Sequence, residues 1–229
     1  MRGVLVVPAY NEALRLPEKL LEWQQIKKEF HVILVDDGSD DITSSIAKKM
    51  GFEVIRLKKN MGKGYAVRVG MLRALNYNPD FIIFSDADLS VSYNQWQNLI
   101  KYIDSYDVIV ASRHLKGAVV DRSFKRKLMS KVFSFIANDI FNLGIKDTQC
   151  GLKIFNISVV KDLFEEPFML NKFAFDVELL LRAKKKKYRI LEMPVEWKEV
   201  KNSKVNSIKT SIEMFLSLFK LYKKINLWR

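Results

Sequence analysis

The stretch FIIFSDADLS, residues 81–90, decides the fold. An apolar run ends on Ser85, and two aspartates separated by one alanine, Asp86 and Asp88, follow it directly. A short, continuous apolar run of this kind is typical of a strand in a parallel sheet that is covered on both faces. In open parallel sheets, ligands bind beyond the carboxyl ends of the strands. The stretch therefore predicts an α/β fold with a polar site where this strand ends.

The same pattern recurs through the first half of the chain. Short apolar runs alternate with segments of helical period, and the other runs are GVLVVPAY (3–10), HVILVDDGS (31–39), FEVIRLK (52–58) and DVIVASR (107–113). This alternation predicts a mostly parallel sheet flanked by helices. Polar residues follow several of the runs, and we expect them to converge on one site: Pro8, Tyr10, Asn11, Glu12, Asp36, Asp37 and Arg113. A single strand-end carboxylate is more often a cap or turn residue, but the repeated pairs favour function.

Length, charge and cysteine content narrow the class of protein. At 229 residues, with 48% hydrophobic residues, the chain is long enough for one sizeable core. Lys and Arg exceed Asp and Glu by 39 to 26, so the formal charge of +13 favours an anionic partner: nucleotide, phospholipid or nucleic acid. A single cysteine, Cys150, excludes an internal disulfide and a cysteine-rich zinc site, which fits a reducing compartment.

Paired carboxylates in a basic setting favour a bound cation. Close carboxylates share either a proton or a metal ion, and the nearby Lys63, Arg113, Arg122 and Arg126 favour the metal. We therefore expect Mg²⁺ or Mn²⁺ on one side of a diphosphate and cationic side chains on the other. The segment NMGKGYA (60–66) is able to supply backbone N–H groups and a lysine to a nucleotide. It matches neither the dinucleotide-binding fingerprint nor the P-loop.

Seven segments, in order along the chain, resemble family 2 glycosyltransferases of the GT-A fold, and more narrowly the polyprenyl-phosphate (dolichyl-phosphate glucose and mannose) synthases. They are VVPAYNE (6–12), VDDGSDD (35–41), NMGKGYA (60–66), SDADLS (85–90), DTQCGLKIF (147–155), FAFDVELL (173–180) and VEWKEV with NSKV (195–205). The resemblance implies inverting transfer of a hexose from a nucleoside-diphosphate sugar, UDP-glucose or GDP-mannose, to the phosphate of a polyprenyl lipid. It also implies a catalytic domain over residues 1–200, followed by a basic amphipathic helical segment over 201–229.

The resemblance also implies roles for individual residues. The nucleoside would be held by Pro8, Tyr10, Glu12, Asp36, Asp37 and the loop of Lys63 and Gly64. Asp86 and Asp88 would hold the donor and its metal, with Asp88 the more direct ligand. The acceptor phosphate would meet Arg113, Arg126 and Ser130. The sugar would lie beside Gln149 and Lys153, and the diphosphate beside Lys204.

A phosphate acceptor simplifies the chemistry. A phosphate monoester carries nearly two negative charges at neutral pH, so it is already a deprotonated nucleophile. Transfer then needs positioning and electrostatic stabilisation rather than a strong base. An alternative is transfer to a sugar hydroxyl in cell-surface glycan assembly, with Asp176 or Glu178 as the base. Glu178 has an equally plausible structural reading, in which it caps or pairs within a helix.

A lipid acceptor requires contact with a membrane surface, and two segments are suited to it. Segments 123–143 and 205–228 combine lysines with apolar residues at helical spacing. Such stripes also pack against a core or a partner subunit, and a membrane-anchored subunit is the second expectation for the C-terminal helix. We expect a peripheral enzyme on the cytoplasmic face of a membrane, whether the chain is complete or precedes membrane spans.

One departure from the resemblance concerns the sugar. After SDADL the mannose synthases commonly place a glutamine that helps to bind metal, whereas this chain has Ser90. The departure weakens both the mannose assignment and the expectation of metal coordination, whereas the TQCG, FDVELL and NSKV segments resemble the glucose-transferring branch more closely. A third hypothesis, a basic module that binds nucleic acid or membrane without catalysis, leaves the ordered acidic motifs unexplained and ranks last, so we expect no nucleic-acid partner.

Overall fold

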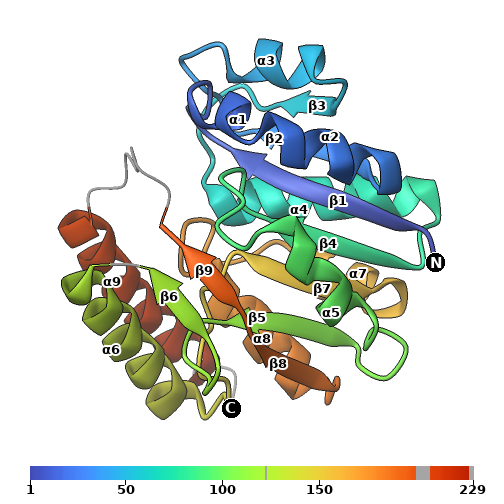
Figure 1. Cartoon of the computed structure of the whole chain (residues 1–229). Coiled ribbons are helices and arrows are strands. Elements are labelled where there is room, and N and C mark those ends of the chain that lie inside the picture. The colour runs from blue at the N-terminus through green and yellow to red at the C-terminus, as the bar shows by residue number, and fades with distance from the viewer. Residues whose placement is uncertain (122, 200–206, 227–229) are drawn as a thin grey trace.

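The computed structural model describes residues 1–121, 123–199 and 207–226. Its main feature is a seven-stranded sheet in the order β3-β2-β1-β4-β7-β5-β8, beside a parallel pair of β6 and β9 (Figure 1). The strands are β1 (Gly3–Ala9), β2 (His31–Asp36), β3 (Glu53–Arg56), β4 (Phe81–Ser85), β5 (Val108–Ser112), β6 (Val119–Asp121), β7 (Leu152–Asn156), β8 (Ile190–Pro194) and β9 (Glu196–Lys198).

The helices lie on both faces of the main sheet. They are α1 (Arg15–Glu18), α2 (Leu20–Glu29), α3 (Thr43–Lys49), α4 (Lys63–Ala74), α5 (Trp96–Ile100), α6 (Phe124–Phe141), α7 (Ile157–Phe164), α8 (Phe175–Lys185) and α9 (Ser207–Asn226), with short 3₁₀ turns η1 (Leu75–Tyr77) and η2 (Tyr93–Gln95). The predicted α/β class with a mostly parallel sheet is confirmed. Strand β7 is the exception, because it runs antiparallel to both of its neighbours, β4 and β5.

Alternation along the strands builds two hydrophobic cores. Val4 and Val6 of β1 face a core with α4, α7 and α8, whereas Leu5 and Val7 face the core that holds Trp23 of α2 and the apolar residues of α5. Because both faces are buried, the strands read as continuous apolar runs in the sequence. The sheet is therefore a rigid platform whose strand ends position the polar loops.

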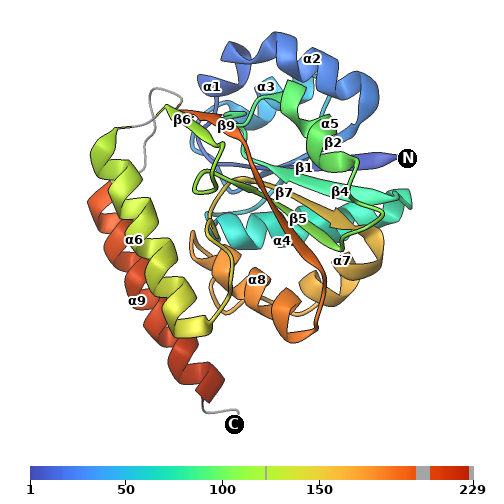
Figure 2. The ribbon, with the colours of Figure 1, turned by 60° about the horizontal axis from the view of Figure 1, so that its bottom comes forward.

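Helices α6 and α9 lie side by side at the edge of the molecule, and Figures 1 and 2 agree on this placement. Phe133 of α6 meets Phe215 of α9 with ring centroids 5.5 Å apart. Leu218 and Leu221 of α9 are buried in the core that contains α4 and α8. One side of the C-terminal helix thus packs against the chain's own core. This agrees with the alternative interpretation of these stripes, in which they pack against a core.

Candidate functional site

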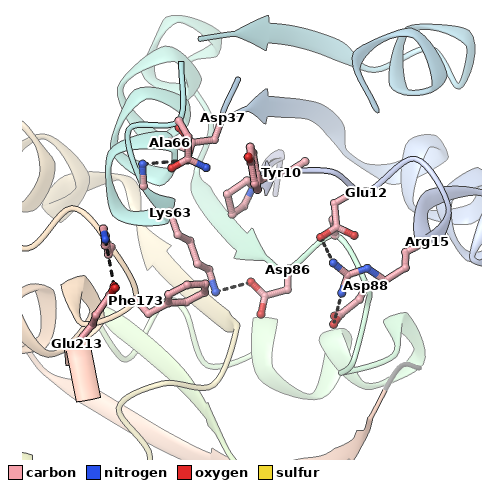
Figure 3. A pocket seen from close by; sticks show the side chains of 16 residues that line it. Tyr10, Glu12, Arg15, Asp37, Lys63, Ala66, Asp86, Asp88, Phe173 and Glu213 are labelled. Atoms are coloured by element: carbon pink, nitrogen blue, oxygen red, sulfur yellow. Dashed lines mark hydrogen bonds and ion pairs between the residues drawn. The ribbon is translucent and has the colours of Figure 1, made fainter. Parts of the chain in front are cut away.

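A pocket of about 450 Å³ opens beyond the carboxyl ends of β1, β2 and β4 (Figure 3). We call it the acidic pocket, because five of its residues are carboxylates. Its lining residues are Pro8, Ala9, Tyr10, Glu12, Arg15, Asp37, Asn60, Gly62, Lys63, Ala66, Asp86, Ala87, Asp88, Lys172, Phe173 and Glu213. The strand-end residues singled out in the sequence thus meet in one place, as a parallel sheet dictates.

The two aspartates at the end of β2, Asp36 and Asp37, have different roles. Asp36 is fully buried, and its carboxylate accepts hydrogen bonds from the Ser39 N–H and the Ser44 hydroxyl. Asp37 accepts from the backbone N–H groups of Met61 (2.7 Å) and Gly62 (2.9 Å), and burial raises its pKa. Asp36 therefore shapes the loop, whereas Asp37 lines the pocket and fixes the turn that leads into α4.

The entry to α4 is held by close backbone packing. Gly62 has φ +99°, a conformation that glycine adopts at little cost. A Cβ on Gly64 would lie 2.5 Å from Cβ of Phe175, so only glycine fits there. The helix starts at Lys63, whose Nζ lies 2.7 Å from Oδ1 of Asp86. Burial opposes the charge on Lys63, but the carboxylates of Asp86, Asp176 and Asp88 together outweigh it and raise the pKa of the lysine, so the ammonium group is kept.

Asp86 and Asp88, which follow β4, both point into the acidic pocket (Figure 3). Asp86 lies next to Lys63, and Asp88 lies near Arg15. Asp88 accepts from the backbone N–H (3.0 Å) and hydroxyl (2.8 Å) of Ser90, and its other oxygen lies 4.0 Å from Arg15. Burial, followed by the charge of Asp86, raises the pKa of Asp88. A cation between the two carboxylates would relieve both effects.

Close backbone approach brings Asp86 to its position. Its N–H donates to the carbonyl oxygen of Gly151 (3.2 Å), at the start of the segment that leads into β7. A Cβ on Gly151 would lie 2.0 Å from Oδ2 of Asp86, so any side chain there would displace the carboxylate. The glycine in DTQCGLKIF is thus required by the aspartate in SDADLS.

Glu12 lines the acidic pocket beside Arg15, which also approaches Asp88 (Figure 3). Its Oε1 accepts from Arg15 at 2.5 Å, while Oε2 is buried and has no hydrogen-bond partner among the described residues. Burial raises the pKa of Glu12 to about 7, against the opposing effect of Arg15. This carboxyl group therefore changes its charge near neutral pH.

The residues of the acidic pocket suit a divalent cation that arrives with a diphosphate. Mg²⁺ is usually held by one or two carboxylates together with substrate phosphates, rather than by an all-protein cage. Asp86 and Asp88 supply that number of carboxylates, and no group of three or more metal-binding side chains occurs among residues 1–121, 123–199 and 207–226. Lys63 and Arg15 balance part of the acidic charge in the structure.

A second pocket, of about 270 Å³, lies between the loop after β5 and helix α6. We call it the basic pocket, because no carboxylate occurs among its described lining residues. Its lining residues are Arg113, His114, Leu115, Ala118, Val120, Lys127, Ser130 and Lys131. The sequence predicted one convergent site, and the structure divides it into two pockets of opposite character.

Arg113 is anchored by a buried ion pair. Its Nε lies 2.7 Å from Oδ2 of Asp147, and its Nη2 lies 2.9 Å from Oδ1 of the same carboxylate. Burial opposes ionisation of Asp147, but Arg113 holds the pKa of this carboxyl group far below its usual range. In return, Asp147 raises the pKa of Arg113 against the opposing effect of burial. Asp86 also contributes to the raised pKa of Arg113, so the charges of the two pockets influence one another.

Several predicted site residues lie elsewhere. Lys153 was expected beside the sugar, but its fully buried Nζ donates to Asp176 (2.6 Å) and to the carbonyl of Cys150 (2.7 Å). Gln149 is outside both linings and donates to the Phe173 carbonyl at 3.3 Å. The side chain of Arg126 and the whole of Lys204 lie outside the part of the chain that the structure describes.

The carboxylate considered as a base, Glu178, has a structural environment. It accepts from the backbone N–H groups of Met169 (3.1 Å) and Leu170 (2.9 Å), and it pairs with Arg182 at 2.7 Å. Neither Glu178 nor Asp176 lines the acidic pocket or the basic pocket. The reading in which Glu178 pairs within its helix agrees with these contacts.

Sequence reasoning missed some pocket residues. The acidic pocket also uses Arg15, Asn60, Lys172, Phe173 and Glu213, and the basic pocket uses Lys127 and Lys131. Arg15 carried a local signal, three residues after Glu12 at the start of a helix. The others come from helices and loops whose placement depends on tertiary packing.

Comparisons with known proteins agree with this geometry. Residues 4–164 match the family described as "Glycosyl transferase family 2". A dolichyl-phosphate β-glucosyltransferase of Drosophila melanogaster is 34% identical over an alignment that covers 98% of this chain and 76% of the fly protein. The human protein of the same name is also 34% identical, over 88% of this chain and 68% of its own length.

Solved structures support the fold. A glucosyl-3-phosphoglycerate synthase from Mycobacterium tuberculosis, crystallised with Mn²⁺, UDP and glucosyl-3-phosphoglycerate, matches with a TM-score of 0.75. The match covers 96% of this chain and 79% of that chain, at 13% identity. The GT-A arrangement implied by the sequence resemblance is therefore confirmed.

Proposed function

The chain belongs to glycosyltransferase family 2, and on that premise we propose that it transfers glucose, with inversion, from a nucleoside diphosphate to the phosphate of a polyprenyl lipid. One observation carries the proposal: a pocket with paired aspartates lies near a basic pocket whose described lining residues include no carboxylate. The first suits a diphosphate with its cation, and the second suits a phosphate monoester. The names of the relatives support glucose and a dolichyl-type acceptor.

In the acidic pocket, Pro8, Tyr10 and Asp37 would hold the nucleoside, and Lys63 would turn from Asp86 to the diphosphate. Asp86 and Asp88 would hold the divalent metal, Mg²⁺ or Mn²⁺. When bound, such a metal neutralises charge on the departing diphosphate. Gln149, Lys153 and Lys204 stay as sequence predictions for the sugar and diphosphate sides.

In the basic pocket, Arg113, Ser130, Lys127 and Lys131 would hold the acceptor phosphate, together with the predicted Arg126. One acceptor oxygen forms a bond to the anomeric carbon, while the bond between that carbon and the diphosphate oxygen breaks. The acceptor changes from a monoester with nearly two charges to a diester with one, and the nucleoside diphosphate leaves with the additional negative charge. No proton has to be removed, which agrees with the absence of Asp176 and Glu178 from both linings.

Helix α6 is suited to lie against a membrane surface. Phe124 and Phe135 are 79% and 72% exposed, and Leu128 and Val132 continue the same outward stripe. On the adjacent flank of this helix, Lys127 and Lys131 line the basic pocket. An interfacial helix has this combination of apolar side chains and lysines, so the stripe would place the pocket at the level of lipid phosphates.

The exposed side of α9 has a similar character. Leu216, Phe219 and Tyr222 are exposed, and Lys220 and Lys223 accompany them. None of the helices among the described residues is long and apolar enough to cross a bilayer. We propose peripheral contact with a membrane through α6 and α9, while a membrane-anchored subunit that covers α9 is the alternative.

A transfer assay tests the proposal. Purified protein is incubated with UDP-glucose or GDP-mannose and a short polyprenyl phosphate, in Mg²⁺ or Mn²⁺, with Asp88→Ala as the control. We expect metal-dependent glucosyl product from UDP-glucose that is lost in the variant. Product from GDP-mannose alone would overturn the choice of sugar, and donor binding without transfer to any polyprenyl phosphate would overturn the lipid acceptor.

A further inference from the structure

His114 occupies a defined position in the basic pocket. It follows Arg113 directly, and its imidazole bridges the loop before β7 and helix α6. Nδ1 lies 2.8 Å from the backbone carbonyl oxygen of Lys146, and Nε2 lies 3.2 Å from the hydroxyl oxygen of Ser130. Ser130 itself is buried and lines the pocket.

These two contacts fix the tautomer. A carbonyl oxygen only accepts, so Nδ1 carries a hydrogen and donates it to Lys146. In the neutral imidazole, Nε2 is then an acceptor, and the Ser130 hydroxyl donates to it. The hydroxyl proton of Ser130 is consequently turned away from any ligand while His114 is neutral. Protonation of Nε2 reverses this arrangement, because Nε2 becomes a donor and Ser130 becomes free to donate elsewhere.

We infer that His114 is a proton-dependent positioning residue for a phosphate monoester in the basic pocket. In its protonated form it frees the Ser130 hydroxyl to donate to a phosphate oxygen and adds a positive charge beside it. This inference rests on the proposed function, since it names a further determinant of acceptor binding at that site.

The charged groups around His114 favour an anion that brings protonation with it. The charged groups around the imidazole are Arg113, Lys127 and Lys131, which line the same pocket, and Asp147; behind them, Glu192 of β8 accepts from the backbone N–H groups of Lys146 and Asp147. Asp147 interacts with His114 electrostatically, but Arg113 already holds both of its carboxylate oxygens. A bound dianion would therefore supply the negative charge that a protonated His114 lacks in the empty pocket.

The same arrangement would distinguish acceptor from product. The acceptor monoester is nearly dianionic, whereas the glycosylated diester is a monoanion. A protonated His114 consequently interacts more strongly with the acceptor than with the product. Turnover would then be accompanied by release of the proton from His114, which would weaken the hold on the product.

The chain contains two histidines, so each imidazole is observable by NMR. His31 is the internal control, because it lies on β2 and pairs with Glu53 at 2.8 Å, away from both pockets. Labelled protein is titrated between pH 5.5 and 8.5, with and without a short water-soluble isoprenyl phosphate, and His114→Asn assigns the signals. We expect the probe to move the titration midpoint of His114 to higher pH and to leave that of His31 unchanged. An unmoved His114 midpoint would overturn the inference.

Kinetics supply a readout that a merely structural role would not move. Above pH 6.5, where the phosphate stays largely dianionic, we expect the acceptor KM of the wild type to increase as pH rises. His114→Gln reaches Ser130 without titrating, and His114→Asn keeps the donor to Lys146 but is too short to reach Ser130. Both variants should show a flat acceptor KM, raised about tenfold at pH 6.5, as for loss of one hydrogen bond to a charged group, with donor KM unchanged.

Transfer by both variants with an unaltered pH profile would refute the role of His114 but leave the proposed function intact. Absence of transfer by the wild type would instead refute the proposed function.

Discussion

The acidic and basic pockets differ in how their charges are balanced. In the acidic pocket, Lys63 and Arg15 approach Asp86 and Asp88 from helices, with partly accessible side chains. In the basic pocket, Arg113 is compensated by a fully buried partner, Asp147, while Lys127 and Lys131 line a cavity with no carboxylate among its described lining residues. In the first pocket, a metal ion would replace a cationic side chain beside the aspartates. In the second pocket, the cationic side chains suit a bound anion.

This difference shows how one fold holds two anions close together. A diphosphate and a phosphate repel each other, so each needs its own source of positive charge. A metal supplies that charge where carboxylates gather, and fixed side chains supply it where they do not. The predictions below separate these two sources, and they begin with the largest effect.

Asp88→Asn should abolish most of the transfer activity. The amide keeps the hydrogen bonds from Ser90 but loses the charge that would hold a cation, so kcat should fall about a thousandfold, as for loss of one preorganised electrostatic group. Steady-state transfer assays over a range of metal concentrations measure the effect. Asp162→Asn, on the surface beside Lys186, is the matched control and should retain activity. Equal activity of the two variants would contradict the role of Asp88.

Asp147→Ala should destabilise the fold and weaken the basic pocket. Removing one partner of a buried ion pair leaves Arg113 without compensation, which costs about 3–5 kcal/mol. Chemical denaturation measures the loss in free energy of unfolding. Asp162→Ala removes the exposed partner of Lys186 and Tyr188 and should cost much less, because exposed pairs contribute little to stability. A similar, small cost for both variants would show that Arg113 has another partner.

Glu12 should make stability depend on pH. Its pKa is raised from 4.5 to about 7, so between these values the folded chain keeps a proton that the unfolded chain has released. Stability from this group is complete below about pH 4.5 and is lost as pH rises to 7, by up to about 3 kcal/mol.

Glu12→Gln should remove that dependence. The variant should be more stable than the wild type at pH 8 and similar to it at pH 4, as measured by denaturation at each pH. Glu22→Gln, which alters a more accessible pair with Lys19, is the control and should leave the dependence in place. Parallel curves for Glu12→Gln and the wild type would rule out ionisation of Glu12 in this window.

Lys131→Ala should have the smallest effect, and it should be confined to the acceptor. Loss of one exposed cation from the basic pocket should raise the acceptor KM a few-fold, roughly in line with a weak, salt-screened charge interaction. Donor KM should not change, and the difference should shrink at high salt. Lys161→Ala on α7 is the control. An increase in donor KM would mean that the two pockets do not separate donor from acceptor.

The sequence by itself determined five strands of the sheet and much of the acidic pocket. Apolar runs that end in polar pairs fix parallel strands, and parallel strands place their carboxyl ends at one edge. Glu12, Asp37, Asp86 and Asp88 therefore could be assigned to one site from local pattern alone, because each lies within a few residues of a strand end.

Only the tertiary structure decided which polar residues are buried and how the second pocket forms. Lys153 and Glu178 stand in the same motifs as site residues, yet each is turned inward to a buried partner. Strand β7 enters antiparallel between β4 and β5, and it carries Gly151 to Asp86. The basic pocket depends on α6 lying against the loop after β5. These contacts join residues that are far apart in the chain, and their geometry depends on packing, which sequence spacing does not encode.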